Sequence, residues 1–157
     1  MKHSMEVGFS FGATSGVITT LGLMVGLNAS THSGNIVLGG ILTIALADAF
    51  SDALGIHVSE EAENVHTAKE IWFSTLFTFL AKFIFSATFV IPVLLLDLSQ
   101  AVIASLAWGL AVLSVISYRM AKKQNTAPLK VIGEHLLVAI VVVFLTHCIG
   151  DWIATRF

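Results

Sequence analysis

The sequence predicts an all-α integral membrane protein with five transmembrane helices. Hydrophobic residues make up 56% of the 157-residue chain and charged residues only 11%, well below the roughly 25% that is typical of soluble domains. The mean hydropathy is +0.90. The apolar residues gather in five stretches, each long enough to cross a hydrocarbon core that takes about 20 helical residues. We therefore expect a single membrane domain over residues 1–157, surrounded by the lipid bilayer.

The five predicted spans are joined by short polar connections. They cover residues 7–29, 36–57, 71–96, 101–118 and 129–153. Thr67 and Glu70 fit a capping box at the start of the third span. Asp97 and Gln100 resemble a second box at the start of the fourth, and Pro128 suits the first turn of the fifth. These start signals support the division into five helices.

The basic residues predict that the N-terminus faces the cytosol. In that orientation six lysines and arginines lie on the cytosolic side, Arg156 lies on the other, and Lys82 lies within the membrane. Cytosolic loops of membrane proteins carry such an excess of basic residues. The six are Lys2, Lys69, Arg119, Lys122, Lys123 and Lys130. The C-terminus is then expected on the opposite side.

Two carboxylates lie inside the second predicted span. Asp48 and Asp52 are four residues apart, so a helix places them on one face. A carboxylate at bilayer depth is costly, and it usually serves an ion or proton pathway or pairs with a buried cation. Lys82, in the third span, reaches the depth of Asp48, and the two are expected to form an ion pair. The sequence offers no cation at the depth of Asp52, which makes Asp52 the better candidate for a metal or proton site.

The first predicted span adds hydroxyl groups and small residues. Ser15 and Thr19 lie near the depth of Asp48, and hydroxyl oxygens beside carboxylates suit a hard or borderline metal ion. The same hydroxyls can instead bond across helices or to their own backbone. Gly8, Gly12 and Gly16 form a tandem GxxxG pattern, which favours close helix packing within one protomer or between two copies.

Further candidate residues lie near the cytosolic ends of the spans. Carboxylates and imidazole follow the second span and form a candidate capture site for metal ions or, alternatively, a solvated helix end. This group is Glu60, Glu61, Glu63 and His66. If the segment is helical, Glu63 and His66 share a face with Glu70. Glu134 and His57 are candidates for a pathway entrance or proton relay.

The common catalytic motifs are missing from the sequence. It contains no HExxH, no GxSxG and no phosphate-binding loop. We therefore expect neither an enzyme nor a permanently bound cofactor, and no nucleic-acid partner. An intramembrane hydrolase that uses Asp48 with Asp52 is the least favoured alternative. A stronger alternative is a non-transporting membrane scaffold or partner subunit, with Asp48 and Lys82 as a structural ion pair.

Two segments resemble the vacuolar iron transporter family. Residues 15–26, SGVITTLGLMVG, resemble the DGxxTTxxxxxG pattern of its first helix. Residues 51–59, SDALGIHVS, resemble the SMxxGxYxS pattern of its second helix, which acidic residues also follow. The motifs cover about the first 63 residues, and the rest of the chain resembles the family only in its layout of spans.

The resemblance implies a homodimer of five-helix protomers that associates through the first helix. Family members move Fe²⁺ or Mn²⁺ out of the cytosol, in some cases as antiporters that exchange metal for protons, along a path lined by the first two helices. By resemblance, Ser15 and Asp52 fall on this path. The compact chain further favours a prokaryotic plasma membrane.

Four departures from the family pattern refine this expectation. Ser15 stands where the family has an aspartate, and Asp52 stands where it has a methionine. One carboxylate has thus moved from the first helix to the second, and the loss of a sulfur ligand favours harder ions such as Mn²⁺. His57 replaces the usual aromatic residue, and the connection of about ten residues before the third span lacks the metal-binding insert of some members.

Overall fold

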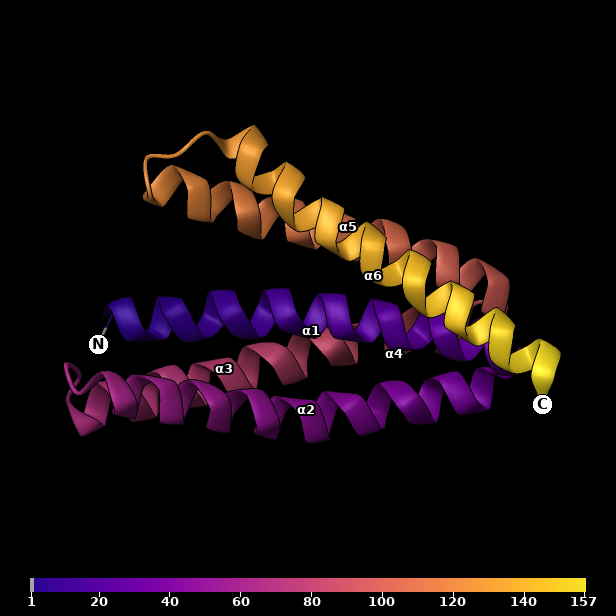
Figure 1. Cartoon of the computed structure of the whole chain (residues 1–157), viewed down its shortest axis with the longest axis horizontal. Coiled ribbons are helices and arrows are strands. Elements are labelled where there is room, and N and C mark those ends of the chain that lie inside the picture. The colour runs from indigo at the N-terminus through magenta and orange to yellow at the C-terminus, as the bar shows by residue number, and fades with distance from the viewer. Residues whose placement is uncertain (1) are drawn as a thin grey trace.

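The computed structural model describes residues 2–157, with the Lys2 side chain outside the described part, and it contains only helices and their connections in this range (Figure 1). The helices are α1 (Lys2–Thr31), α2 (Gly34–Glu63), α3 (Ala68–Thr88), α4 (Val90–Leu95), α5 (Leu98–Lys123) and α6 (Pro128–Arg156). Five helical segments are long and apolar enough to span a membrane, with α3 and α4 together forming one of them. The prediction of five helices long and apolar enough to span a membrane is therefore confirmed.

Helix α1 is the centre of the bundle. It packs against α2, α3, α5 and α6, and Figure 1 shows it between the α2–α3 pair and the α5–α6 pair. Its residues Ala13, Val17, Leu21 and Met24 are fully or almost fully buried and belong to the hydrophobic core. The outer helices turn large apolar side chains outward, as a surface in contact with lipid requires.

The tandem GxxxG pattern brings α1 against α3. A Cβ atom at Gly8 or Gly12 would collide with the backbone carbonyl oxygens of Ser74 or Thr78, and one at Gly16 would lie 2.9 Å from the carbonyl oxygen of Lys82. Only glycine permits this approach of the two backbones. The pattern therefore serves packing within the protomer.

The third span is broken into two helices near its end. Phe89 separates α3 from α4, and Pro92 lies within α4. Proline has no backbone N–H, so Pro92 cannot donate the helical hydrogen bond to the carbonyl of Thr88. At the same residue the Thr88 hydroxyl accepts a hydrogen bond from Trp108 Nε1 at 3.1 Å, which links the break to α5.

The helix ends test the predicted start signals. The capping box of Thr67 and Glu70 is present, and Pro128 lies in the first turn of α6, so both predictions are confirmed. The predicted box at Asp97 is wrong: Asp97 is the N-cap of α5, but its side chain makes no capping hydrogen bond in the described chain. Its backbone carbonyl alone accepts, from the Ala101 N–H at 2.8 Å.

The basic residues gather at one end of the bundle. Figure 1 shows the N-terminus, the α2–α3 connection and the α5–α6 connection at the same end, with the C-terminus at the other. Lys69 lies in the first turn of α3, Lys130 lies in the first turn of α6 and Lys123 ends α5, whereas Arg156 ends α6. The predicted cytosolic N-terminus rests on this excess of basic residues at the end of the bundle that holds the N-terminus.

Substituting Gly12 should destabilise the bundle. We expect Gly12→Ala to lower the free energy of unfolding by about 1–3 kcal/mol, the usual cost of overpacking, because the new methyl group meets the α3 backbone. The matched control is Gly39→Ala in α2, where an added Cβ meets no described atom within 4 Å. Thermal unfolding in detergent measures both variants, and equal melting temperatures would contradict the α1–α3 packing.

Candidate ion site

A buried ammonium group lies where α1, α2 and α3 meet. Lys82 projects from α3, and its side chain is 1% exposed. Its Nζ lies 2.5 Å from Asp48 Oδ2 and forms a second ion pair with Asp52 Oδ2. It also donates a hydrogen bond of 2.9 Å to Ser15 Oγ. One lysine thus holds two carboxylates of α2 and a hydroxyl of α1 together.

The Asp48–Lys82 ion pair is confirmed, but the expectation that Asp52 has no cation is wrong. Asp48 and Asp52 are one helical turn apart on the face of α2 that meets α3. The long lysine side chain ends between them, so a single ammonium reaches both. The expectation compared only the depths of the residues in the membrane. It did not allow for the length of the lysine side chain, which lets its ammonium reach a carboxylate one turn away.

The two hydroxyls of α1 differ in what they contact. Ser15 Oγ donates a hydrogen bond of 2.6 Å to Asp52 Oδ2, which brings it into the site. Thr19 Oγ1 donates instead to the Ser15 carbonyl of its own helix at 2.9 Å. Ser15 is therefore part of the polar site, whereas the Thr19 proton serves the backbone.

The site carries one negative charge in excess when all three ionisable groups are charged, because two carboxylates face one ammonium. The Lys82 side chain is fully enclosed, but those of Asp48 and Asp52 are 27% and 21% exposed. A groove of 660 Å³ between α1 and α2 reaches Asp48. It is lined by Leu23, Leu27, Ile36, Gly40, Thr43, Ile44, Ala47, Asp48 and Ser51. Asp48 is therefore accessible from the groove, on a side that the lysine does not occupy.

The ligands available in one protomer are few. Among residues 2–157, no group of three or more histidine, cysteine, aspartate or glutamate side chains is close enough to hold a metal ion. Asp48 and Asp52 with the Ser15 hydroxyl offer only oxygen donors, which suit hard cations. A metal ion here would take further ligands from water, backbone or a second copy of the chain.

The candidate capture residues do not converge. Glu60 is 7% exposed and accepts a hydrogen bond from Ser74 of α3, so its carboxylate belongs to the helix packing. Glu61 and Glu63 are exposed. The only contact within the set is an ion-pair distance of 3.5 Å between Glu63 Oε2 and His66 Nε2.

The helical alignment of Glu63, His66 and Glu70 is wrong. Helix α2 ends at Glu63, and Asn64 adopts a left-handed conformation with φ of 52°. Asparagine tolerates this conformation better than most residues, and it ends the helix there. The Glu70 carboxylate caps α3 through Thr67.

The two candidate entrance residues lie on different parts of the bundle. His57 Nδ1 lies 2.9 Å from Thr75 Oγ1, in a hydrogen bond between α2 and α3 on the same side as the ion site. Glu134 lies on α6, 4.0 Å from Lys130 of the same helix, and is exposed. Since α6 packs on α1 and α5, Glu134 lies apart from the α2–α3 pair that holds His57.

One polar feature was missed from the sequence. Ser74, Thr78, Lys82 and Ser86 follow one another at intervals of four on α3, and all are at most 1% exposed. They form the face of α3 that meets the glycines of α1. The four-residue spacing of small polar side chains around Lys82 was the available signal.

No family model matches the chain, and neither the curated proteins nor the solved structures include one similar to it.

Removal of Lys82 alone should destabilise the protein more than removal of the whole charged group. We expect Lys82→Met to lower the free energy of unfolding by roughly 3–5 kcal/mol, because it leaves two unpaired carboxylates. Adding Asp48→Asn and Asp52→Asn should recover most of that loss. Thermal unfolding measures the series beside Lys130→Met, which removes an exposed lysine. A Lys82→Met protein as stable as the unmodified chain would contradict the buried ion site.

Proposed function

We propose that the chain is a divalent-metal transporter that moves Mn²⁺ or Fe²⁺ out of the cytosol, with Asp48 and Asp52 as its central ligands and Ser15 beside them. The observation that carries this proposal is the unequal charge of the buried site. A structural ion pair needs one carboxylate for Lys82, but two are present. The second leaves a negative charge inside the membrane, which attracts a further cation or proton.

The same charge balance supports exchange of metal for protons. With Lys82 protonated and both carboxylates ionised, the site has a net charge of minus one. A proton on one carboxylate brings the net charge to zero, and a divalent ion on both carboxylates brings it to plus one. Metal and proton therefore compete for the same carboxylate oxygens, so metal binding releases the proton.

The resemblance to the vacuolar iron transporter family supports the choice of cargo and direction. It associates Ser15 and Asp52 with the metal path, and the all-oxygen ligand set favours Mn²⁺ over softer ions. Glu61, Glu63 and His66 would then attract cations at the cytosolic end without forming a tight site. From the compact chain we assign the protein to a prokaryotic plasma membrane, and from the basic residues at one end we place its N-terminus in the cytosol.

Dimerisation is part of the proposal because the groove that reaches Asp48 is open along the side of the protomer. A second copy over this side would separate the groove from lipid. The glycines of α1 contact α3 and α6 within the protomer. A dimer through α1 would therefore use the remaining α1 surface beside α2, where Leu23 and Leu27 line the groove.

A membrane scaffold or partner subunit is the second candidate. The observation that favours it is the complete burial of Lys82, which forms ion pairs with both carboxylates within the protomer. In that case Asp48, Asp52 and Lys82 can be replaced together by apolar residues, and the protein still folds and still binds its partner proteins. A transporter would lose metal flux in the same variant.

Metal flux into proteoliposomes tests the proposal. The purified chain is reconstituted into vesicles that hold a metal-sensitive dye. Saturable entry of Mn²⁺ or Fe²⁺ into the vesicles should acidify the solution outside them. Asp52→Asn should lower this flux by at least the roughly 10- to 100-fold that loss of even an outer-shell partner costs.

The matched control is Asp151→Asn, which removes an exposed carboxylate at the far end of α6. It should leave flux unchanged. If the folded protein carries neither metal under any imposed pH gradient, or if Asp52→Asn transports as well as the unmodified chain, the proposed function is wrong.

A further inference from the structure

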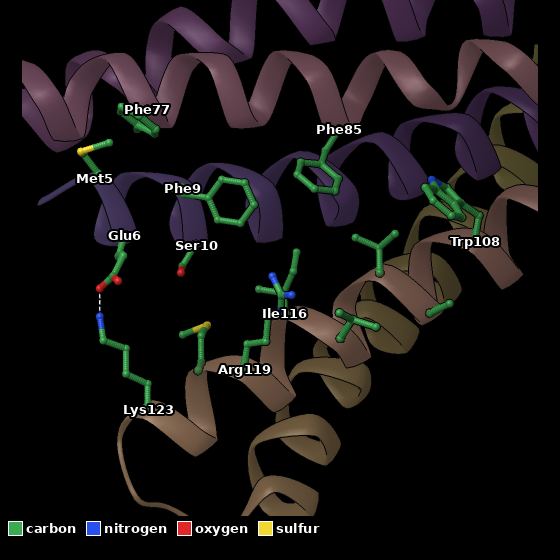
Figure 2. A pocket seen from close by; sticks show the side chains of 14 residues that line it. Met5, Glu6, Phe9, Ser10, Phe77, Phe85, Trp108, Ile116, Arg119 and Lys123 are labelled. Carbon is green, nitrogen blue, oxygen red and sulfur yellow. Dashed lines mark ion pairs between the residues drawn. The ribbon is translucent and has the colours of Figure 1, made fainter. Parts of the chain in front are cut away.

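A second cavity lies on the opposite side of α1 from the ion site. It has a volume of 710 Å³ and lies between α1, α3 and α5, within the roughly 300–1,000 Å³ range of ligand pockets. Its lining is mainly apolar and aromatic (Figure 2). The larger apolar side chains include Met5, Phe9, Phe77, Phe85, Trp108 and Ile116.

The charged residues of this cavity leave one cation unpaired. Glu6, Arg119 and Lys123 line it, and Glu6 forms an ion pair with Lys123 across the mouth, between α1 and α5 (Figure 2). Arg119 has no ion-pair partner in the described chain, and Figure 2 shows its side chain entering the space between α5 and α1. The cavity therefore has an excess positive charge at its mouth.

The length of the cavity matches one leaflet of a bilayer. Trp108 and Arg119 lie eleven residues apart on α5, which corresponds to about 16 Å along the helix. The hydrocarbon core is about 30 Å thick, so this is roughly half of it. Arg119 lies one turn from the end of α5, near the headgroup level, and Trp108 lies near the midplane.

We propose that this cavity binds one anionic phospholipid of the leaflet at the basic end of the bundle. The acyl chain fills the apolar space between α1 and α5 as far as Trp108. The headgroup phosphate pairs with the Arg119 guanidinium, whose planar group of donors matches phosphate. Neither a free phosphate, which leaves the apolar lining empty, nor a neutral lipid, which leaves Arg119 without a counter-charge, satisfies both parts of the cavity.

Quenching of tryptophan fluorescence by brominated lipids tests the proposal. The chain contains three tryptophans, and Trp72→Phe with Trp152→Phe replaces the two that do not line the cavity, so Trp108 remains as the reporter. In phosphatidylcholine vesicles, a small fraction of acyl-brominated phosphatidylglycerol should quench Trp108 with an apparent affinity roughly fivefold higher than acyl-brominated phosphatidylcholine, the ratio expected for one basic residue at the membrane surface.

Two variants should abolish this preference by different routes. Arg119→Gln removes the cation, and Ala111→Phe fills the cavity while keeping every charge. The control Lys69→Gln removes a basic residue at the same end that does not line the cavity, and the preference should survive it. Equal quenching by the two lipids, or a preference unchanged in both cavity variants, would overturn the proposal. Quenching by neither lipid would also overturn it, because protein would then cover Trp108.

Discussion

The structure depends on the close contact between α1 and α3. Glycines at intervals of four on α1 let the backbone of α3 approach so closely that Lys82 lies directly beside Gly12 and Gly16. At this position the lysine is enclosed, and its ammonium extends to the carboxylates of α2. Larger side chains on α1 would move Lys82 away from Asp48 and Asp52. The helix contact and the charged site therefore depend on each other, since each buried charge needs its partners at hydrogen-bond distance.

In the central site the Lys82 ammonium is enclosed by its oxygen partners, whereas the two aspartates remain partly exposed. The Lys82 ammonium forms ion pairs with Asp48 and Asp52 and donates a hydrogen bond to Ser15. Asp48 lines the groove beside α2, and the Asp52 side chain is 21% exposed, so both carboxylates keep some access from outside the protomer. A lysine in this position resembles a bound cation that is tethered to the protein. This is the physical basis on which a dissociable cation and a proton would compete for the same pair of aspartates.

The sequence predicted the helices well because apolar runs of membrane length are unambiguous, and the Thr67 capping box and Pro128 marked two of their starts correctly. It also identified Asp48 and Lys82 as partners, from depth alone. It did not predict that Asp52 shares the same ammonium, because side-chain reach between helices depends on their separation. The Asp97 cap and the aligned acidic face failed for a local reason: hydrogen-bond choices at helix ends depend on the backbone geometry that forms there.

The central position of α1 has a consequence for biosynthesis. Of the five candidate spans, α1 is the least apolar and the most enclosed, with half of its most apolar stretch buried, whereas α6 is the most apolar and the least enclosed. Because the chain is made from its N-terminus, the helix that most needs protein neighbours enters the bilayer before any of them exists. Its glycine face stays against lipid until α3 is inserted. The arrival of α3 then supplies the partner of α1 and the counter-ion of Asp48 and Asp52 in a single docking step.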